Sequence, residues 1–272
     1  MTKAIERVLL TLDATADTRT AITIAVRLAA RAGMRLHAVF VEDEELLNLA
    51  RLSIAREVVA GSGAGGLSGG DVELHLRAAA SHTQEDVRGA ARLHAIEYSF
   101  EIVRGGAEAA LTVASESDLV VAAALARPVA GYFRVASRWH QALECVPGLI
   151  LLAQESDNKS NDFVVLLCKR SPGSARMLHA AARIAELGAG TLTVICPSEL
   201  STAEDCAEWI DQQVAPAPIK PKIETAPPGL AALEVRIAEL DCGLLALDAA
   251  APKRGQLTEI AQRLRCDVLI AN

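Results

Sequence analysis

The sequence predicts an α/β protein built from two tandem, doubly wound units, each with a parallel five-stranded sheet. Three observations lead to this prediction. Short runs of Val, Leu and Ile alternate with amphipathic stretches, the same succession occurs twice, and 272 residues suit two ordinary domains. Because hydrophobic residues form 51% of the chain and charged residues 22%, each unit can bury a core.

The repeat becomes visible when the chain is compared with itself. The matched segments are Val8–Leu12 with Val164–Cys168, Arg27–Ala29 with Arg183–Ala185, Leu36–Val39 with Leu192–Ile195, Asp118 with Asp241, and Leu149–Leu151 with Val268–Ile270. The separation between matched residues shrinks along the chain, so the second copy has lost segments between its elements. Loops tolerate such losses and cores do not.

Each strand is predicted from an apolar run of strand length, and each helix from apolar residues at helical spacing. In copy one we expect strands at 7–12, 35–41, 99–104, 118–124 and 148–153. In copy two we expect them at 163–168, 191–196, 220–225, 242–248 and 266–271. Helices are expected at 18–32 and 174–187, with Gly33 and Gly188 at their C-terminal ends.

The polar stretch from Gln154 to Asp162 has no apolar anchor and is typical of a linker. It divides the chain into a first domain at 1–155 and a shortened second domain at 162–272. The glycine-rich segment 61–70 lacks the Gly-Lys-Ser/Thr of a phosphate-binding loop, so we expect a flexible surface link there.

Charge and hydropathy exclude several classes of function. With 27 basic and 34 acidic residues and no basic run, the chain lacks the positive stripe of a nucleic-acid-binding protein. The longest apolar run, Leu119–Ala126, is far shorter than the ~20 residues of a membrane span. The N-terminus shows no signal-peptide pattern, and we expect a cytoplasmic protein.

The cysteines and histidines give no pattern typical of metal binding, and no metal is expected. None of the six cysteines forms a C-x-x-C pair, and most lie in apolar strands, where a reduced cysteine packs as a small hydrophobe. A redox role is the alternative, with Cys242 and Cys266 as its best candidates. His75 and His82 stand about 10.5 Å apart along a predicted helix, too far to share one ion.

Four segments together resemble the universal stress protein superfamily. They are the strand Arg7–Leu12 followed by Asp13, the strand ending in Phe40-Val41-Glu42, the turn Arg104-Gly105-Gly106, and the strand Asp118–Val121. The resemblance implies a Rossmann-like fold of the adenine nucleotide alpha hydrolase type. It also implies that the fifth strands of the two copies pair to form an internal pseudo-dimer, and it leaves both a monomer and a homodimer open.

The same resemblance implies where a nucleotide would bind. In the family an acid ends the first strand, backbone groups at the end of the second strand meet adenine, and a loop with three glycines holds the phosphates. In copy one, Asp13 and Val41 match the first two features. Ala123, Ala126 and Ala136 stand where the family has the glycines, and Ser137 follows.

Glycine matters in such a loop because backbone N–H groups must approach the phosphate oxygens closely, in dihedrals that a Cβ obstructs. We therefore expect that tight triphosphate binding is lost from copy one. Asp13 has a second interpretation as a strand-end turn residue, and Ser137 as a helix cap. In copy two Lys169 replaces the acid, and the loop from Asp248 to Arg254, before Gly255 and Gln256, is too short for a phosphate site.

Aromatic residues are scarce, yet several gather in the segment that replaces the phosphate loop. They are Tyr132, Phe133 and Trp139, with Arg134 between them. They either fill the space of a lost nucleotide site or form an anchor for a protein partner, since aromatic and arginine side chains dominate interface energetics.

These observations predict a non-catalytic regulatory or stress-response protein of the universal stress type that binds a protein or a small ligand. One alternative is a protein that holds ATP or AMP in domain 1 and hydrolyses it slowly or not at all. The other is a soluble sensor that docks on a transporter or kinase. No catalytic residues are assigned.

Overall fold

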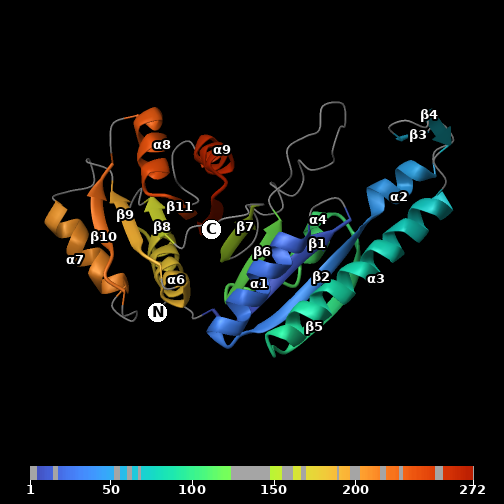
Figure 1. The fold of residues 1–272 in the computed structure, drawn as a ribbon, viewed down its shortest axis with the longest axis horizontal. Coiled ribbons are helices and arrows are strands. Elements are labelled where there is room, and N and C mark those ends of the chain that lie inside the picture. Colours follow the sequence, from blue (N-terminus) through green and yellow to red (C-terminus); the bar gives the residue numbers. More distant parts are fainter. Residues whose placement is uncertain are drawn as a thin grey trace.

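The computed structural model is an elongated α/β molecule in which one long sheet runs through both copies (Figure 1). The described residues are 5–14, 18–51, 56–59, 63–66, 69–123, 148–154, 162–166, 170–188, 190–196, 203–214, 219–226, 229–248 and 254–271. The remaining residues include most of the predicted phosphate-loop segment and the predicted linker, so the domain limits stay a prediction.

The first half of the sheet contains five parallel strands in the order β5-β2-β1-β6-β7. Their bounds are Arg7–Asp13 for β1, Arg35–Asp43 for β2, Tyr98–Gly105 for β5, Asp118–Ala123 for β6 and Leu149–Ala153 for β7. All five lie within a few residues of the predicted strands. The central strands are buried on both sides, which is why they read as continuous apolar runs.

The second half repeats this order as β10-β9-β8-β11-β12. The bounds are Asp162–Leu166 for β8, Leu192–Cys196 for β9, Lys222–Thr225 for β10, Cys242–Asp248 for β11 and Asp267–Ala271 for β12. The prediction of two tandem doubly wound units is confirmed.

The two halves meet at their fifth strands. β7 and β12 pair antiparallel, with Leu149 opposite Ala271 and Leu152 opposite Val268. The strand order of one half therefore mirrors that of the other, and the ten strands form one sheet. This is the internal pairing that the sequence resemblance implied.

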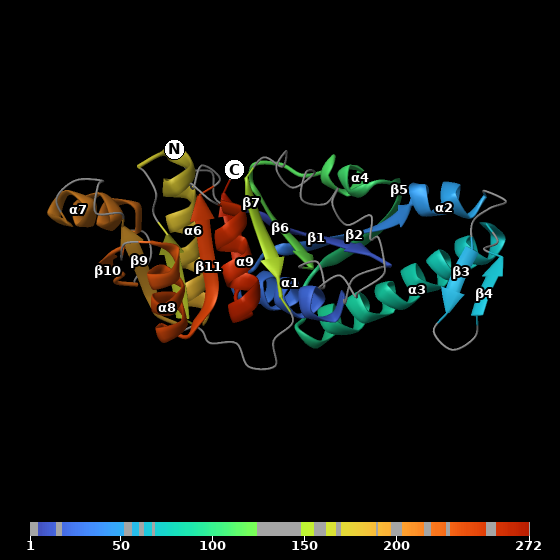
Figure 2. The same cartoon turned by 90° about the horizontal axis from the view of Figure 1, so that it is seen from above.

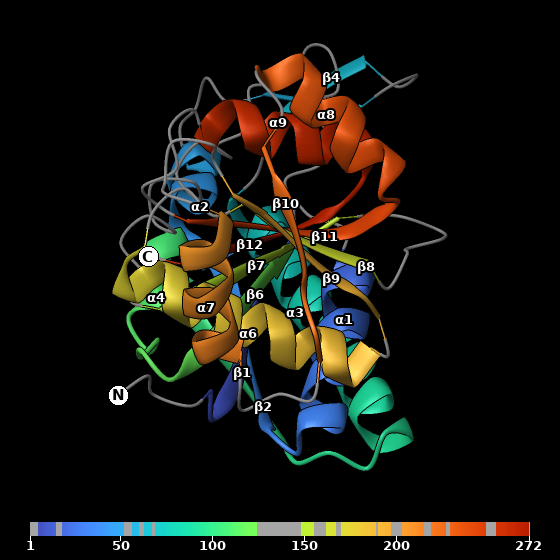
Figure 3. The same ribbon diagram turned by 90° about the vertical axis from the view of Figure 1, so that its left-hand side faces the viewer.

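Helices cover both faces of the sheet. Their bounds are Thr18–Ala32 for α1, Glu44–Ala50 for α2, Gly69–Leu93 for α3, Ala107–Leu111 for α4, Pro172–Gly188 for α6, Ala203–Val214 for α7, Leu230–Glu239 for α8 and Arg254–Leu264 for α9. One apolar core joins the sheet to α1, α3, α6 and α7, and a second core on the opposite face joins it to α4, α8 and α9. Figure 2 shows α4 opposite α1 and α3, and Figure 3 shows α8 and α9 opposite α6.

The helix α1 illustrates why the sequence folds in this way. Alanines at positions 21, 25 and 29 recur one turn apart on its buried face, and their small side chains let the helix lie close to the strands. Gly33 follows the helix with φ +64°, a left-handed conformation that glycine adopts without strain. The predicted helix and its predicted end are both confirmed.

An extension of domain 1 corrects one prediction. Within the glycine-rich segment 61–70, Gly63–Gly66 forms strand β4, which pairs antiparallel with β3 (Arg56–Val59), and the last two glycines begin α3. A flexible link was the wrong interpretation for these residues, because the backbone pairing of a hairpin requires few side chains. The hairpin lies at the far end of the molecule beside α2 and α3 (Figure 2).

A small apolar cluster joins the two helices of this extension. Its buried residues are Leu47 and Ala50 of α2 with Val72 and Leu76 of α3. Among the helices that the structure describes, none combines the length and the apolar character needed to cross a membrane.

Candidate functional site

The carboxyl edge of the domain 1 sheet is the place where this topology puts a binding site. After β1 the chain adds β2 and β5 on one side of it, and then adds β6 and β7 on the other side. The strand order therefore reverses between β1 and β6. In open α/β sheets, ligands bind outside the carboxyl ends of the strands at such a switch point. The predicted site residues Asp13, Val41 and Ala123 all come from the ends of these strands.

Asp13 and Val41 are direct neighbours. They are partners in the parallel register of β1 and β2, so the last residue of the first strand lies beside Val41 of the second. Asp13 is half-buried, whereas only 3% of Val41 is exposed. The structure thus brings together the two residues that the resemblance assigned to the ribose and adenine side of a nucleotide.

Ala123 completes the described part of the site. It is the last residue of β6, and the residue before it, Ala122, is the register partner of Thr11 in β1. Ala123 is therefore level with the end of β1, at the position that the sequence resemblance assigned to the phosphate loop. Outside the described residues lie the other predicted site positions: Ala126, Ala136, Ser137, Tyr132, Phe133, Arg134 and Trp139.

A cluster of charged side chains lies at the same edge, one strand further out. Arg104 of β5 donates from Nε and Nη2 to Glu42 Oε2 of β2, at 3.2 and 2.9 Å. Its Nη2 also lies 3.5 Å from Glu73 of α3, which accepts a hydrogen bond from Arg77 at 2.8 Å. The hydrogen bond with Glu42 raises the pKa of Arg104.

Sequence reasoning missed this charged cluster, because its members are far apart in the chain and only the register of β2 and β5 joins them. The sequence signals were Glu42 directly after Val41 and Arg104 in the turn before two glycines. Since Glu42 is buried and paired, the cluster fixes the ends of β2 and β5 next to the candidate site.

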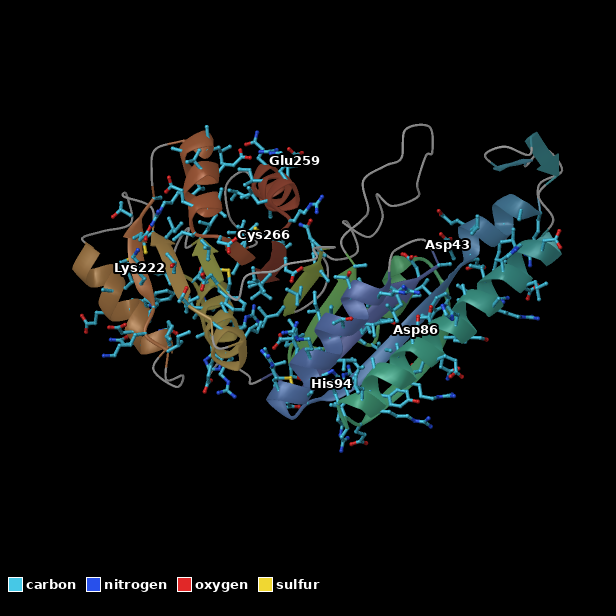
Figure 4. The ribbon with its side chains drawn as sticks, in the orientation of Figure 1. Asp43, Asp86, His94, Lys222, Glu259 and Cys266 are labelled. Carbon is cyan, nitrogen blue, oxygen red and sulfur yellow. The ribbon has the colours of Figure 1, made fainter. Side chains whose placement is uncertain are left out.

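Two local features set the shape of this edge. Gly105 ends β5 with φ +152°, and a Cβ there would lie 2.9 Å from the Cβ of Ala109, so the turn into α4 requires glycine. Asp43, marked in Figure 4 where β2 passes into α2, caps that helix. Its Oδ1 accepts hydrogen bonds from the backbone N–H of Glu45 at 2.8 Å and of Leu46 at 3.2 Å.

Comparison with solved structures agrees with this architecture over nearly the entire chain. A universal stress protein from Archaeoglobus fulgidus DSM 4304 superposes with a TM-score of 0.65 at 12% sequence identity, over 99% of this chain and 97% of that one. The chain has the universal stress protein fold.

Two further structures support the assignment of the universal stress protein fold. A protein from Pseudomonas aeruginosa UCBPP-PA14, provisionally named as a universal stress protein, gives a TM-score of 0.58 at 14% identity over 98% of this chain and 93% of its own. A functionally unknown protein from Pseudomonas aeruginosa PAO1 gives 0.58 at 13% identity over 98% and 92%. No protein-family model and no curated protein sequence matches the chain.

The second copy of the universal stress protein fold presents a different carboxyl edge. β11 ends at Asp248 and α9 begins at Arg254, so Gly255 and Gln256 belong to the first turn of that helix. Lys169, the counterpart of Asp13, lies outside the described residues. Where the second strand ends, copy two has Cys196, which matches Phe40 of copy one in the repeat.

Four cysteines of copy two form two close pairs. The thiols of Cys196 and Cys206 lie 3.4 Å apart, and the Cys242 and Cys266 side chains are joined by a hydrogen bond. All four are buried, as the packing interpretation of the sequence predicted, and Cys266 is marked in Figure 4. Burial and the neighbouring thiol raise the pKa of Cys196 to about 12. Cys145 and Cys168 lie outside the described residues.

The sequence also gave no sign of a polar cluster in the domain 1 sheet, formed by His37, Ser99 and Glu101. His37 Nδ1 shares a hydrogen bond of 2.7 Å with Ser99 Oγ, and His37 Nε2 lies 3.5 Å from Glu101 Oε2. His37 and Ser99 are register partners, so the contact joins neighbouring strands away from the carboxyl edge. His75 and His82 are exposed on α3, and the described residues contain no group of three or more side chains suited to a metal ion.

Proposed function

We propose that this chain is a non-catalytic regulatory protein of the universal stress type that binds a protein or small ligand and has largely lost the capacity to bind ATP. The observation that carries the proposal is the composition of the domain 1 edge. Asp13 and Val41 lie side by side, but alanine replaces glycine at the adjoining end of β6 and at the two later positions of the loop.

The physical argument concerns the phosphates. Each phosphate oxygen needs backbone N–H donors at close range, and a Cβ at these positions limits both the approach and the dihedrals. The adenine and ribose side depends on strand ends, which tolerate side chains. The residues present therefore suit a nucleoside better than a triphosphate.

Restoring the glycines tests this proposal. We expect ATP with Mg²⁺ to leave the thermal unfolding of the wild-type chain nearly unchanged. The triple variant Ala123→Gly, Ala126→Gly, Ala136→Gly should gain a saturable, ATP-dependent rise in melting temperature. As a matched control, the same triple variant with Asp13→Ala should lose this gain, because the acid of the ribose side is gone.

The proposal fails if the wild-type chain is itself stabilised by ATP. A ligand at 100 times its dissociation constant adds about 2.7 kcal/mol to the free energy of unfolding, which is readily measured. That result would favour the second candidate, a protein that holds ATP or AMP in domain 1. The register pairing of Asp13 with Val41 is the observation in favour of this candidate. Phosphate release assays would then show whether hydrolysis follows.

The third candidate, a soluble cytoplasmic sensor docked on a transporter or kinase, depends on Tyr132, Phe133, Arg134 and Trp139. Exchange of Tyr132 and Phe133 for alanine should abolish capture of a specific partner without loss of stability if these residues form an anchor. Loss of stability with every interaction intact would instead favour a space-filling role in the lost nucleotide site.

A further inference from the structure

The thiols of Cys196 and Cys206 meet at the carboxyl edge of domain 2. Cys196 is the last residue of β9, and Cys206 lies in the first turns of α7. Their sulfur atoms are 3.4 Å apart, and the two residues are 6% and 3% exposed. In copy one the same edge carries the candidate nucleotide site, so the thiol pair of copy two lies at the edge that corresponds to it.

We propose that Cys196 and Cys206 form a redox modification site that closes to an intramolecular disulfide when a peroxide or a disulfide oxidant is present. The inference goes beyond the proposed function and does not depend on whether domain 1 binds a nucleotide. It gives domain 2 a role of its own, as the oxidant-responsive half of the molecule.

The geometry requires only a small movement. A disulfide bond is about 2.05 Å long, so the two sulfur atoms must approach by about 1.4 Å from their present separation. One cysteine ends a strand and the other lies near the start of a helix, so side-chain rotation and a slight shift of α7 can supply this approach. Closure would tie the start of α7 to the end of β9.

The chemistry balances with a peroxide. One thiolate attacks a peroxide oxygen, the S–O bond forms, the O–O bond breaks, and water leaves after protonation. The second thiolate attacks the resulting sulfenic acid, so the S–S bond forms, the S–O bond breaks and a second water leaves. The two sulfur atoms together lose two electrons, which reduce one molecule of hydrogen peroxide to two molecules of water.

The surroundings of the pair control the rate of closure. Burial keeps the Cys196 thiol protonated, whereas the positive charge of Arg170 favours its thiolate. We therefore expect closure over minutes to hours under sustained oxidant, not an instant response.

The second thiol pair provides an internal comparison. Cys242 begins β11 and Cys266 directly precedes β12, so this pair lies at the opposite edge of the same sheet. The hydrogen bond with Cys266, together with burial, raises the pKa of Cys242 strongly. Cys242 lies in β11 and Cys266 adjoins β12, its paired neighbour, so closure there would have to distort the sheet. We expect this pair to stay reduced while the chain is folded.

The test is oxidation of the folded chain with hydrogen peroxide, followed by alkylation of free thiols and peptide mass analysis. Trypsin releases Cys196 and Cys206 in one peptide, residues 184–222, because Pro221 blocks cleavage after Lys220. A disulfide lowers the mass of this unalkylated peptide by about 2 Da, and dithiothreitol should reverse the change. Cys242 and Cys266 fall in separate peptides, so their disulfide would be seen as a cross-link.

Variants separate the proposal from general thiol oxidation. Cys206→Ser should prevent formation of the disulfide, whereas the matched control Cys242→Ser should leave it unchanged. If Cys206→Ser fails to fold, Cys196→Ala offers the same test from the other side. Closure in the wild-type chain should also raise the melting temperature by about 5 °C, reversibly, because it constrains the unfolded chain.

Three results would overturn the inference. The first is full alkylation of both thiols after oxidation of the folded chain. The second is irreversible oxidation of a single cysteine with no disulfide. The third is a cross-link between Cys242 and Cys266 that forms before the mass of peptide 184–222 changes.

Discussion

Asp118 shows how a single buried charge can be held in this fold. It is 2% exposed at the start of β6, and its carboxylate accepts a hydrogen bond from Arg7 Nε at 3.0 Å and from the Ser115 backbone N–H at 2.9 Å. Arg7 also donates to the Val113 carbonyl oxygen at 2.9 Å. We expect Asp118→Asn to lower the free energy of unfolding by about 2 kcal/mol, because Arg7 loses its counter-charge.

Urea denaturation of the Asp118→Asn variant measures this loss, and the repeat supplies a control. Asp241 matches Asp118 in the sequence comparison, yet it is exposed in a turn with φ +47°. Asn tolerates that conformation as well as Asp does, so Asp241→Asn should change stability by less than about 0.5 kcal/mol. Equal losses in the two variants would contradict the assigned roles.

His37 provides a prediction about protonation at the residue scale. Burial lowers its pKa, the charge of Arg7 lowers it further, and Glu101 and Asp118 act in the opposite direction. The folded chain therefore favours neutral imidazole. The stability that this group contributes is complete above the ordinary histidine pKa of about 6.5 and declines as the pH falls below that value.

Proton NMR of the His37 imidazole should give a titration midpoint below 6.5. In Glu101→Gln the midpoint should fall further, because the nearby negative charge is removed. Ser99→Ala keeps both charges and serves as the control for the loss of a hydrogen bond. A midpoint at or above that of an unfolded histidine would show that burial does not dominate.

At the scale of elements, the sequence predicted all ten strands of the main sheet but not the separate hairpin of β3 and β4. Val120 and Val121 belong to an uninterrupted apolar run, since a parallel strand is buried on both faces. Strand β4 reads Gly-Ala-Gly-Gly and carries no such signal, because backbone pairing alone defines it. The contact between Glu42 and Arg104 and the thiol pair of Cys196 and Cys206 arise from topology, which residue spacing does not reveal.

The edge strand β10 is held by charge. Arg236 of α8 donates from Nε and Nη2 to the two carboxylate oxygens of Glu224, at 2.8 and 2.7 Å, and Lys222 adds an ion pair at 2.8 Å. The hydrogen bonds from Arg236, and to a smaller extent the bond from Lys222, lower the pKa of Glu224 to about 2. Its stabilising effect is therefore present above the ordinary glutamate pKa and is lost as the pH falls from about 4.5 toward 2.

We expect Glu224→Gln to lower the free energy of unfolding at pH 7 by about 1 kcal/mol, with partial screening by solvent taken into account. The difference from the wild-type chain should narrow as urea titrations move from pH 5 to pH 3. Glu234→Gln, which breaks the exposed pair with Arg263 between α8 and α9, is the matched control and should have a smaller effect. A difference that widens in acid would contradict this assignment.

At the scale of the whole molecule, the antiparallel junction of β7 and β12 decides whether the two copies act as one unit. Leu151 and Leu269 are opposite each other across it, and both are buried in the core that joins α1 and α6 to the sheet. Each exchange for alanine should cost about 2–5 kcal/mol. Because the two residues are cross-strand partners in one packed core, the double variant should deviate from additivity by at least about 0.5 kcal/mol.

The pair Leu10→Ala and Leu269→Ala is the control for this cycle, since Leu10 lies in β1, further from the junction. The losses in free energy of unfolding caused by these two substitutions should add within about 0.5 kcal/mol. Calorimetry should also show one transition for the wild-type chain, because the apolar core continues from one copy into the other. Additive losses at Leu151 and Leu269 together with two separate transitions would mean that the copies fold independently.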